Sequence, residues 1–182
     1  MASVTYEIDP AHAHLQFSVR HLMVSNVRGS FTGVKGSVVY DPDKPAGTRV
    51  EATIDASTIR TGDDQRDTHL KSPDFLDVAK YPTMTFRATK VEQKSAEEFM
   101  VTGDLTIHGV TKPVVLDVHE VSEETKDPWG NTRIGASAKG KIKRSDFGLT
   151  WNAALEAGGM MVGDDVKLDF ELEFVKAKSA TA

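Results

Sequence analysis

Histidine side chains near the N-terminus are the first candidates for chemistry in this chain. His12 and His14 are separated by one residue, a spacing that puts two metal ligands on one face of an extended strand. They share their parity with the polar residues Gln16 and Ser18, and the sequence contains no cysteine that could complete a site. We therefore interpret both as surface histidines and predict that the protein binds no metal.

His21 lies on the opposite parity, after the apolar residues Leu15, Phe17 and Val19. An imidazole on this apolar face could meet the polar head of a bound ligand, or it could hydrogen-bond to a backbone carbonyl. An enzyme acting on a lipid would also need a nucleophile with a base, or paired carboxylates, on the same face. The pattern places no titratable residue there except His21, so we predict no catalytic residues.

Arg66 and His69 are three residues apart in a short segment with helical signals. They could contact a polar head group at the mouth of a cavity. Alternatively, Arg66 could pair with a carboxylate such as Asp67 or Asp74 and hold the segment in place. We favour the second interpretation, since a long ligand gains mainly from burial of its apolar tail. Trp151 is an aromatic candidate for the rim of the same cavity.

The elements that must position these residues are strands. From residue 166 to residue 174, apolar residues alternate with charged ones without interruption. A period of two gives a strand one apolar and one polar face. The pattern recurs along most of the chain and predicts an all-β, antiparallel fold of about eight strands, either a sandwich or a closed barrel. It predicts separate strands at 4–8 and 15–19, and one glycine-interrupted strand at 31–40.

One segment, residues 61–82, lacks this alternation and predicts a short helical insertion. Thr61 with Asp64 three residues later resembles a capping box, which marks the start of a helix. Ser72 followed by Pro73 repeats a start signal, and Pro82 ends the segment. The sequence therefore predicts two short helical turns between strands.

Length and composition limit the classes of function. The 182 residues suit a single domain, which we place at 1–176, with a flexible C-terminal tail at 177–182. A net charge of −5 argues against a nucleic-acid partner. No apolar run approaches the ~20 residues of a transmembrane helix, and the first residues do not resemble a signal peptide. We expect a cytoplasmic protein, or a periplasmic one if a leader has been removed.

Small residues on the predicted apolar faces bear on whether the interior is filled. They are Ala52, Ala56, Ala88, Gly103, Ala136, Ala138 and Gly140. An eight-stranded barrel can be filled by its own side chains or can hold one small ligand. Small wall residues leave volume for an apolar guest. The alternative is that facing Phe and Leu side chains fill the space.

Several motifs in a fixed order resemble a known family, the YceI-like lipid-binding proteins. They lie at residues 17–21, 55–61, 66–76, 80–86, 102–114 and 143–148, and include Lys-Tyr-Pro-Thr-Met-Thr-Phe at 80–86 and Thr-Ile-His-Gly-Val-Thr-Lys-Pro at 106–113. The resemblance covers essentially the whole chain. It implies a lipocalin-like barrel that binds a polyisoprenoid or a similar long-chain amphiphile, commonly as a homodimer.

We therefore predict a non-catalytic carrier that holds a quinone, a prenol or a fatty-acid derivative, with no cofactor apart from this lipid. The predicted wall residues are Phe17, Val19, Phe31, Phe86, Leu105, Ile107 and Phe170. The candidates near the polar end are His21, Arg66, His69 and Trp151. Two alternatives stay open: an enzyme that acts on an isoprenoid or lipid, and a filled barrel that serves as an interaction module.

Overall fold

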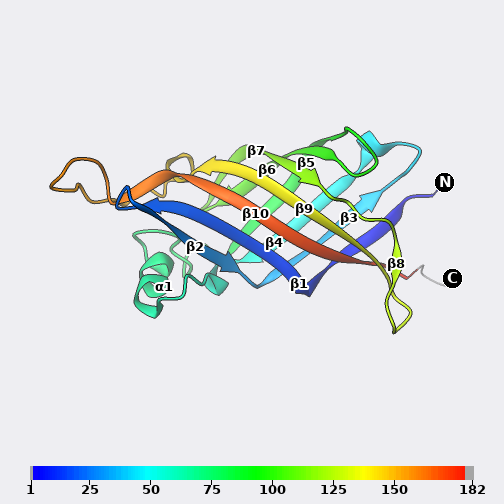
Figure 1. Ribbon diagram of the computed structural model, residues 1–182, viewed down its shortest axis with the longest axis horizontal. Helices are drawn as coiled ribbons and strands as arrows, with labels where there is room; N and C mark the ends of the chain where they lie inside the picture. Colours follow the sequence, from blue (N-terminus) through cyan, green and yellow to red (C-terminus); the bar gives the residue numbers. More distant parts are fainter. Residues whose placement is uncertain (1, 179–182) are drawn as a thin grey trace.

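Eight antiparallel strands close into a barrel in the computed structural model, which describes residues 2–178 (Figure 1). In order around the barrel they are β1 (Val4–His21), β3 (Val34–Tyr40), β4 (Arg49–Asp55), β5 (Thr83–Gln93), β6 (Phe99–Ile107), β7 (Val110–His119), β9 (Thr132–Lys143) and β10 (Val162–Lys176). β10 pairs with β9 on one side and with β1 on the other, which closes the sheet. The predicted all-β barrel is confirmed, and the sandwich is excluded.

Two further strands in the described range lie outside this ring. β2 (Ser25–Phe31) pairs with the C-terminal half of β1, and β8 (Thr125–Lys126) pairs with the start of β9. The 3-10 helices η1 (Pro45–Gly47), η2 (Ala56–Thr58) and η3 (Arg144–Phe147) lie in connections between strands. Within residues 2–178, no helix has the length and apolar character needed to cross a bilayer. Residues 179–182 of the predicted tail lie outside the described part of the chain.

The alternation of apolar and charged residues determines which side chains enter the barrel. In β10, Leu168, Phe170 and Leu172 face an internal cavity, whereas Asp169 and Glu171 between them are exposed. Because successive side chains of a strand point to opposite faces, the apolar set of every strand lines the interior. The sequence pattern alone was sufficient to predict this division.

β1 is longer than the sequence pattern indicated. The strands predicted at 4–8 and 15–19 are one strand, in which the register with β10 shifts between Ile8 and Ala13. The interval contains Pro10, which has no N–H to donate, and the register shift adds residues to one strand. Both features obscure the alternation in the sequence. Conversely, the strand predicted at 31–40 is interrupted at residues 32–33, because β1 exchanges β2 for β3 as its partner there.

The helical insertion contains one α-helix, α1 (Asp64–Lys71), and the second predicted helical turn is wrong. The N-cap is Asp63, whose carboxylate accepts the Arg66 N–H at 2.9 Å, and not Thr61. Ser72 ends α1 by donating its hydroxyl to the His69 carbonyl at 2.6 Å, and turns follow it. A serine before a proline can thus stop a helix as well as start one, and the sequence signal does not distinguish the two.

Residues 61–82, which we call the lid segment, cover one end of the barrel (Figure 1). Leu76 is buried in a cluster with Met84 and Ile107 of the barrel wall and with Phe147 of η3. Phe147 is only 1% exposed. This cluster fixes the lid segment to the barrel, so the side chains of α1 have a defined position over the interior.

Candidate functional site

The barrel encloses two apolar cavities, one behind the other. The larger, which we call the distal cavity, has a volume of about 490 Å³ and lies away from the lid segment. The smaller, the lid cavity, has a volume of about 240 Å³ and lies beneath it. Along β1, Leu15 lines the distal cavity while Phe17 lines the lid cavity, and Leu168 of β10 lines both. Together they occupy the interior in which a ligand was predicted.

Small side chains form part of the distal cavity wall, as the sequence suggested. Ala52, Ala136 and Ala138 line it. Three of the predicted site residues also lie on this wall: Phe86, Leu105 and Phe170. The other small residues do not leave space. Ala56, for example, is 1% exposed within the packed cluster under the lid segment.

Acidic side chains lie at the rim of the distal cavity. Glu97, Glu123 and Glu124 line it, and Glu124 accepts the Tyr6 hydroxyl at 2.6 Å and the Lys176 ammonium at 2.9 Å. These hydrogen bonds, the Tyr6 bond first, lower the pKa of the Glu124 carboxyl. Burial, with the carboxylate beside it, raises the pKa of Tyr6. This end of the barrel therefore carries negative charge at neutral pH.

The lid cavity brings together most of the predicted site residues. Eight of them line it: Phe17, Val19, His21, Phe31, Arg66, His69, Ile107 and Trp151. All eleven predicted residues thus lie on one cavity wall or the other, and their contact with a ligand stays a prediction. Within residues 2–178 the His21 imidazole makes no hydrogen bond, and it lines the lid cavity.

Glycines on the apolar faces accommodate large side chains instead of leaving voids. A Cβ at Gly29 would overlap the tip of the Phe17 ring, and one at Gly103 would overlap the Phe86 ring. At Gly140, Leu116 and Leu168 both approach the position of the missing Cβ, at 2.9 and 3.6 Å. Leu168 is also the residue that both cavities share. Leu168 therefore lies at the boundary between the two cavities, at the level of Gly140.

Within the described part of the chain, Arg66 forms no ion pair with a carboxylate, contrary to the interpretation that we favoured from sequence. Its Nε donates to the Thr61 hydroxyl at 2.7 Å and its Nη2 donates to the Thr61 carbonyl at 2.8 Å. Asp67 instead accepts the Thr61 N–H and hydroxyl. Thr61 therefore binds both charged side chains and separates them. Both bonds lie within the lid segment, so they stabilise its start and do not join it to the barrel, and the guanidinium lines the lid cavity.

His69 lies in an aromatic cluster over the lid cavity. Its ring meets Phe75 edge-on at 5.1 Å and Trp151 at 4.8 Å between centroids, and its Nε2 lies 2.9 Å from the Asp74 carboxylate. A histidine oriented by a carboxylate is half of a nucleophile–base arrangement. Within residues 2–178, however, no hydrogen bond links the His69 ring to a serine or threonine hydroxyl. The cluster thus places aromatic rings and one polar imidazole edge beside the cavity.

Arg144 is a lining residue that the sequence reasoning missed. It is 6% exposed and donates to the carbonyls of Gly163, Leu149, Trp151 and Val162 at 2.7 to 3.2 Å. Burial lowers its pKa, which the negative charge of Asp164 partly opposes. The signal that could have found it is its parity, because Arg144 continues the apolar-face positions 134 to 142 of β9. Its four bonds hold the 148–163 connection against the lid cavity.

Both histidines of the H-x-H spacing are exposed, which confirms the prediction that they lie on the surface. His14 points to the surface, whereas His12 lies near Asp9 and Glu173, with its Nδ1 3.0 Å from the Asp9 carboxylate. Arg133 donates to the same Asp9 oxygen at 2.7 Å and, with the His12 contact, lowers the Asp9 pKa to about 2. A guanidinium at this position supplies the positive charge that a metal would bring, so the cluster is an ion-pair network.

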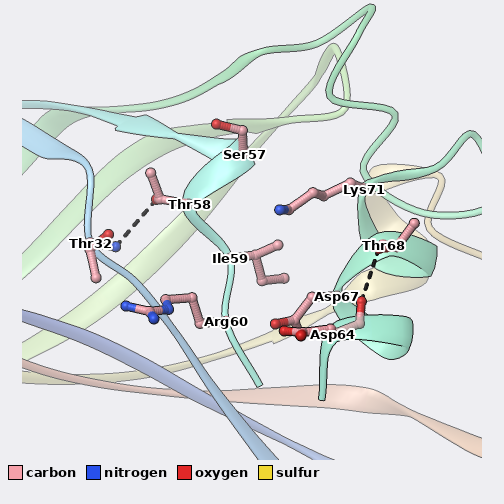
Figure 2. A pocket seen from close by; sticks show the side chains of 9 residues that line it. All are labelled: Thr32, Ser57, Thr58, Ile59, Arg60, Asp64, Asp67, Thr68 and Lys71. Atoms are coloured by element: carbon pink, nitrogen blue, oxygen red, sulfur yellow. Dashed lines mark hydrogen bonds between the residues drawn. The ribbon is translucent and has the colours of Figure 1, made fainter. Parts of the chain in front are cut away.

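A polar pocket of about 410 Å³ lies on the outer surface between η2 and α1 (Figure 2). Thr58 Oγ1 accepts the Thr32 N–H at 3.2 Å across it, and Lys71 extends into it from the end of α1. Its cations are balanced by the carboxylates of Asp64 and Asp67. Hydroxyls and mixed charges do not suit an apolar chain, so this pocket differs in character from the two cavities inside the barrel.

Comparison with known proteins agrees with this architecture. Residues 6–174 match the YceI-like domain. Protein YceI of Escherichia coli O6:H1 is 42% identical over 146 residues, which cover 79% of this chain and 75% of the relative. The crystal structure of the YCEI protein of Campylobacter jejuni superposes with a TM-score of 0.72 at 36% identity, covering 87% of this chain and 90% of that chain.

A second similar structure is that of a ligand-binding domain. It is a polyisoprenoid binding domain from Saccharophagus degradans implicated in plant cell wall breakdown. It superposes with a TM-score of 0.65 at 19% identity, covering 94% of this chain and 98% of that chain. At this level of identity, the likeness concerns the fold alone.

Proposed function

The chain belongs to the YceI-like family, and we propose that it is a non-catalytic carrier of a polyisoprenoid or another long-chain amphiphile, such as a quinone, a prenol or a fatty-acid derivative. The observation that carries this proposal is the pair of apolar cavities in line within a closed barrel. The ligand of the Saccharophagus degradans domain, which shares the fold, is consistent with this class.

The energetics of burial favour a long ligand. Each buried CH₂ contributes about 0.8 kcal/mol, whereas association costs ~4–15 kcal/mol in lost freedom of motion. A short apolar molecule therefore binds weakly. A chain of about fifteen or more carbons can reach micromolar affinity, which corresponds to ~8 kcal/mol. Two cavities in line accommodate such a chain better than either cavity alone.

The charges at the two ends suggest how the ligand is oriented. Arg66 and Arg144 line the lid cavity together with His21 and His69, whereas glutamates line the distal rim. A polar or anionic head group is therefore more favourably placed at the lid end, with the apolar tail in the distal cavity. Trp151 and the ring of His69 would then lie beside the head group.

Extraction of the purified protein with organic solvent, followed by mass spectrometry, tests this function. We expect a co-purifying long-chain lipid, and native mass spectrometry should show it bound to a dimer of the protein. An extract without lipid, together with failure to take up added ubiquinone or polyprenol, would favour the interaction module. Chemical turnover of the bound lipid would favour the enzyme.

A further inference from the structure

Four exposed apolar side chains gather at one end of the molecule. Leu22, Met23 and Val24 of the β1–β2 turn are 40%, 57% and 74% exposed, and Met160 of the β10 approach is 45% exposed. We call these four residues the apolar tip. Large contiguous apolar patches on a protein surface indicate an interaction site, whereas single exposed apolar residues are common.

The backbone of this turn makes the apolar residues more significant. Leu22 and Met23 have φ values of +52° and +62°, and the turn is closed by the Val24 N–H, which donates to the His21 carbonyl at 3.1 Å. Two consecutive left-handed residues in a hairpin turn are strongly preferred as Asn and Gly. Leucine and methionine are strained in this conformation. The turn thus presents apolar side chains to solvent at the expense of its own stability.

A second loop extends the same surface. Residues 153–161 form a narrow hairpin that projects beyond the ends of β1 and β2 (Figure 1). The hairpin is composed of alanine, leucine, glycine and methionine, with Glu156 as its one charged residue. The Leu22 N–H donates to the Met161 carbonyl at 2.7 Å, which joins the two loops. They therefore form one surface, in which Met23 also lies against Gly159.

The apolar tip lies directly beside the lid cavity. His21 and Met161, which adjoin the tip in sequence, both line this cavity. Arg20 lines it as well and donates to the Met23 carbonyl at 3.2 Å. Arg28, on the neighbouring strand β2, is also exposed. Two arginines thus lie behind a narrow apolar projection. This arrangement is typical of a segment whose apolar side chains enter a bilayer while its cations contact the lipid head groups.

We propose that the apolar tip docks onto the surface of a lipid bilayer and places the lid cavity against it. A second copy of the chain is a less suitable occupant, because four partly exposed side chains supply only part of the ~800 Å² that each partner of a stable complex buries. The proposal concerns a surface outside the barrel interior. It therefore does not depend on which ligand the cavities hold, although docking would give an amphiphile a short path between bilayer and barrel.

Vesicle flotation tests the proposal with vesicles of phosphatidylcholine alone and with added phosphatidylglycerol. The informative variant is Leu22→Asn with Met23→Gly, because these residues suit the turn and should not destabilise the fold. We expect the wild-type protein to float with the vesicles, more strongly when they are anionic, and the double variant to lose about tenfold or more of its partition coefficient. The control is Trp129→Ser, which removes an 80% exposed apolar residue from a distant turn and should not change flotation.

Absence of vesicle binding by the wild-type protein, or equal binding by the double variant, would overturn the proposal. A change in the sedimentation mass of the double variant without any vesicle binding would assign the tip to contact between copies, and would overturn it as well. The lipid content of both proteins is measured in parallel. An empty barrel in a protein that still floats would refute the carrier function and leave the docking surface in place.

Discussion

Replacing Ala138 by leucine asks most directly whether the distal cavity is a binding site. Ala138 lies on β9, lines the distal cavity, and is opposite Phe170 of β10 and Val118 of β7. Its side chain is 6% exposed, so the added atoms would extend into the barrel and not into solvent. The substitution therefore reduces the cavity volume that is left for the proposed ligand, and it changes no polar group.

The magnitude follows from the carbon atoms involved. Ala138→Leu adds three carbons, and each can displace one CH₂ of a bound chain. The loss of binding energy is then up to ~2.4 kcal/mol, or about sixtyfold in affinity. The added methyl groups occupy empty apolar space, so the free energy of unfolding of the lipid-free protein should stay constant or rise by up to about 1 kcal/mol. The two quantities are expected to change independently.

The assay uses delipidated protein, with urea unfolding for stability and cis-parinaric acid, a fluorescent long-chain fatty acid, for affinity. The matched control is Ala56→Leu, the same substitution in the packed cluster under the lid segment, where Ala56 is 1% exposed. Overpacking there should reduce the free energy of unfolding by ~1–3 kcal/mol. If Ala138→Leu destabilises the protein as much as this control does, the interior is filled and our reasoning is wrong.

Other predictions concern individual side chains. Arg144→Ala leaves several carbonyls without donors and should lower the free energy of unfolding by about 2–4 kcal/mol in urea; a loss below ~1 kcal/mol would show that water replaces the guanidinium. The pKa of Asp9 is lowered to about 2 in the folded protein, whereas that of an unfolded Asp is ~3.9. The ionised carboxylate therefore adds to the free energy of unfolding above pH ~3.9, and this contribution is lost as the pH falls through about 2. The melting temperature should therefore fall with decreasing pH, and it should fall less steeply in Arg133→Gln than in the wild-type protein. An unchanged pH profile in the variant would contradict the role of the ion pair. Gly29→Ala should displace the Phe17 ring into the lid cavity and weaken cis-parinaric acid binding about fivefold or more, at a cost of ~1–2 kcal/mol in stability; full affinity would mean that the ring moves elsewhere.

The strand pattern limited the fold to a sandwich or a closed barrel because its information is local, and the resemblance to the YceI-like family indicated the barrel. The alternation at 166–174 and its repeats identify which residues face inward, and inward faces on about eight strands leave few architectures. Partner exchange is not local information. β1 pairs with β2 along one half and with β3 along the other, and no pattern within residues 4–21 records that change. The interruption at residues 32–33 was missed for the same reason.

Wall residues were accessible to the same reasoning, whereas polar partners were not. Parity was sufficient to place Phe17, Leu105 and Phe170 on the cavity walls. Parity could not predict that Arg66 would donate to Thr61. The hydroxyl and the carbonyl of Thr61 compete with nearby carboxylates for the guanidinium, and the outcome depends on the three-dimensional geometry. Arg144 was not considered for the interior, although its parity continues that of the apolar residues of β9. A buried guanidinium becomes acceptable once backbone carbonyls satisfy its N–H groups.

The division between the cavities bears on which ligands the barrel can accept. Leu116 of β7 and Leu168 of β10 both lie over Gly140, and Leu168 lines both cavities. The division consists of side chains, which can change rotamer, and not of backbone, which cannot move without opening the sheet. A short ligand could occupy one cavity and leave the leucines in place. A chain long enough to gain from both cavities must displace them, so selectivity for chain length should depend on these two leucines more than on the aromatic walls.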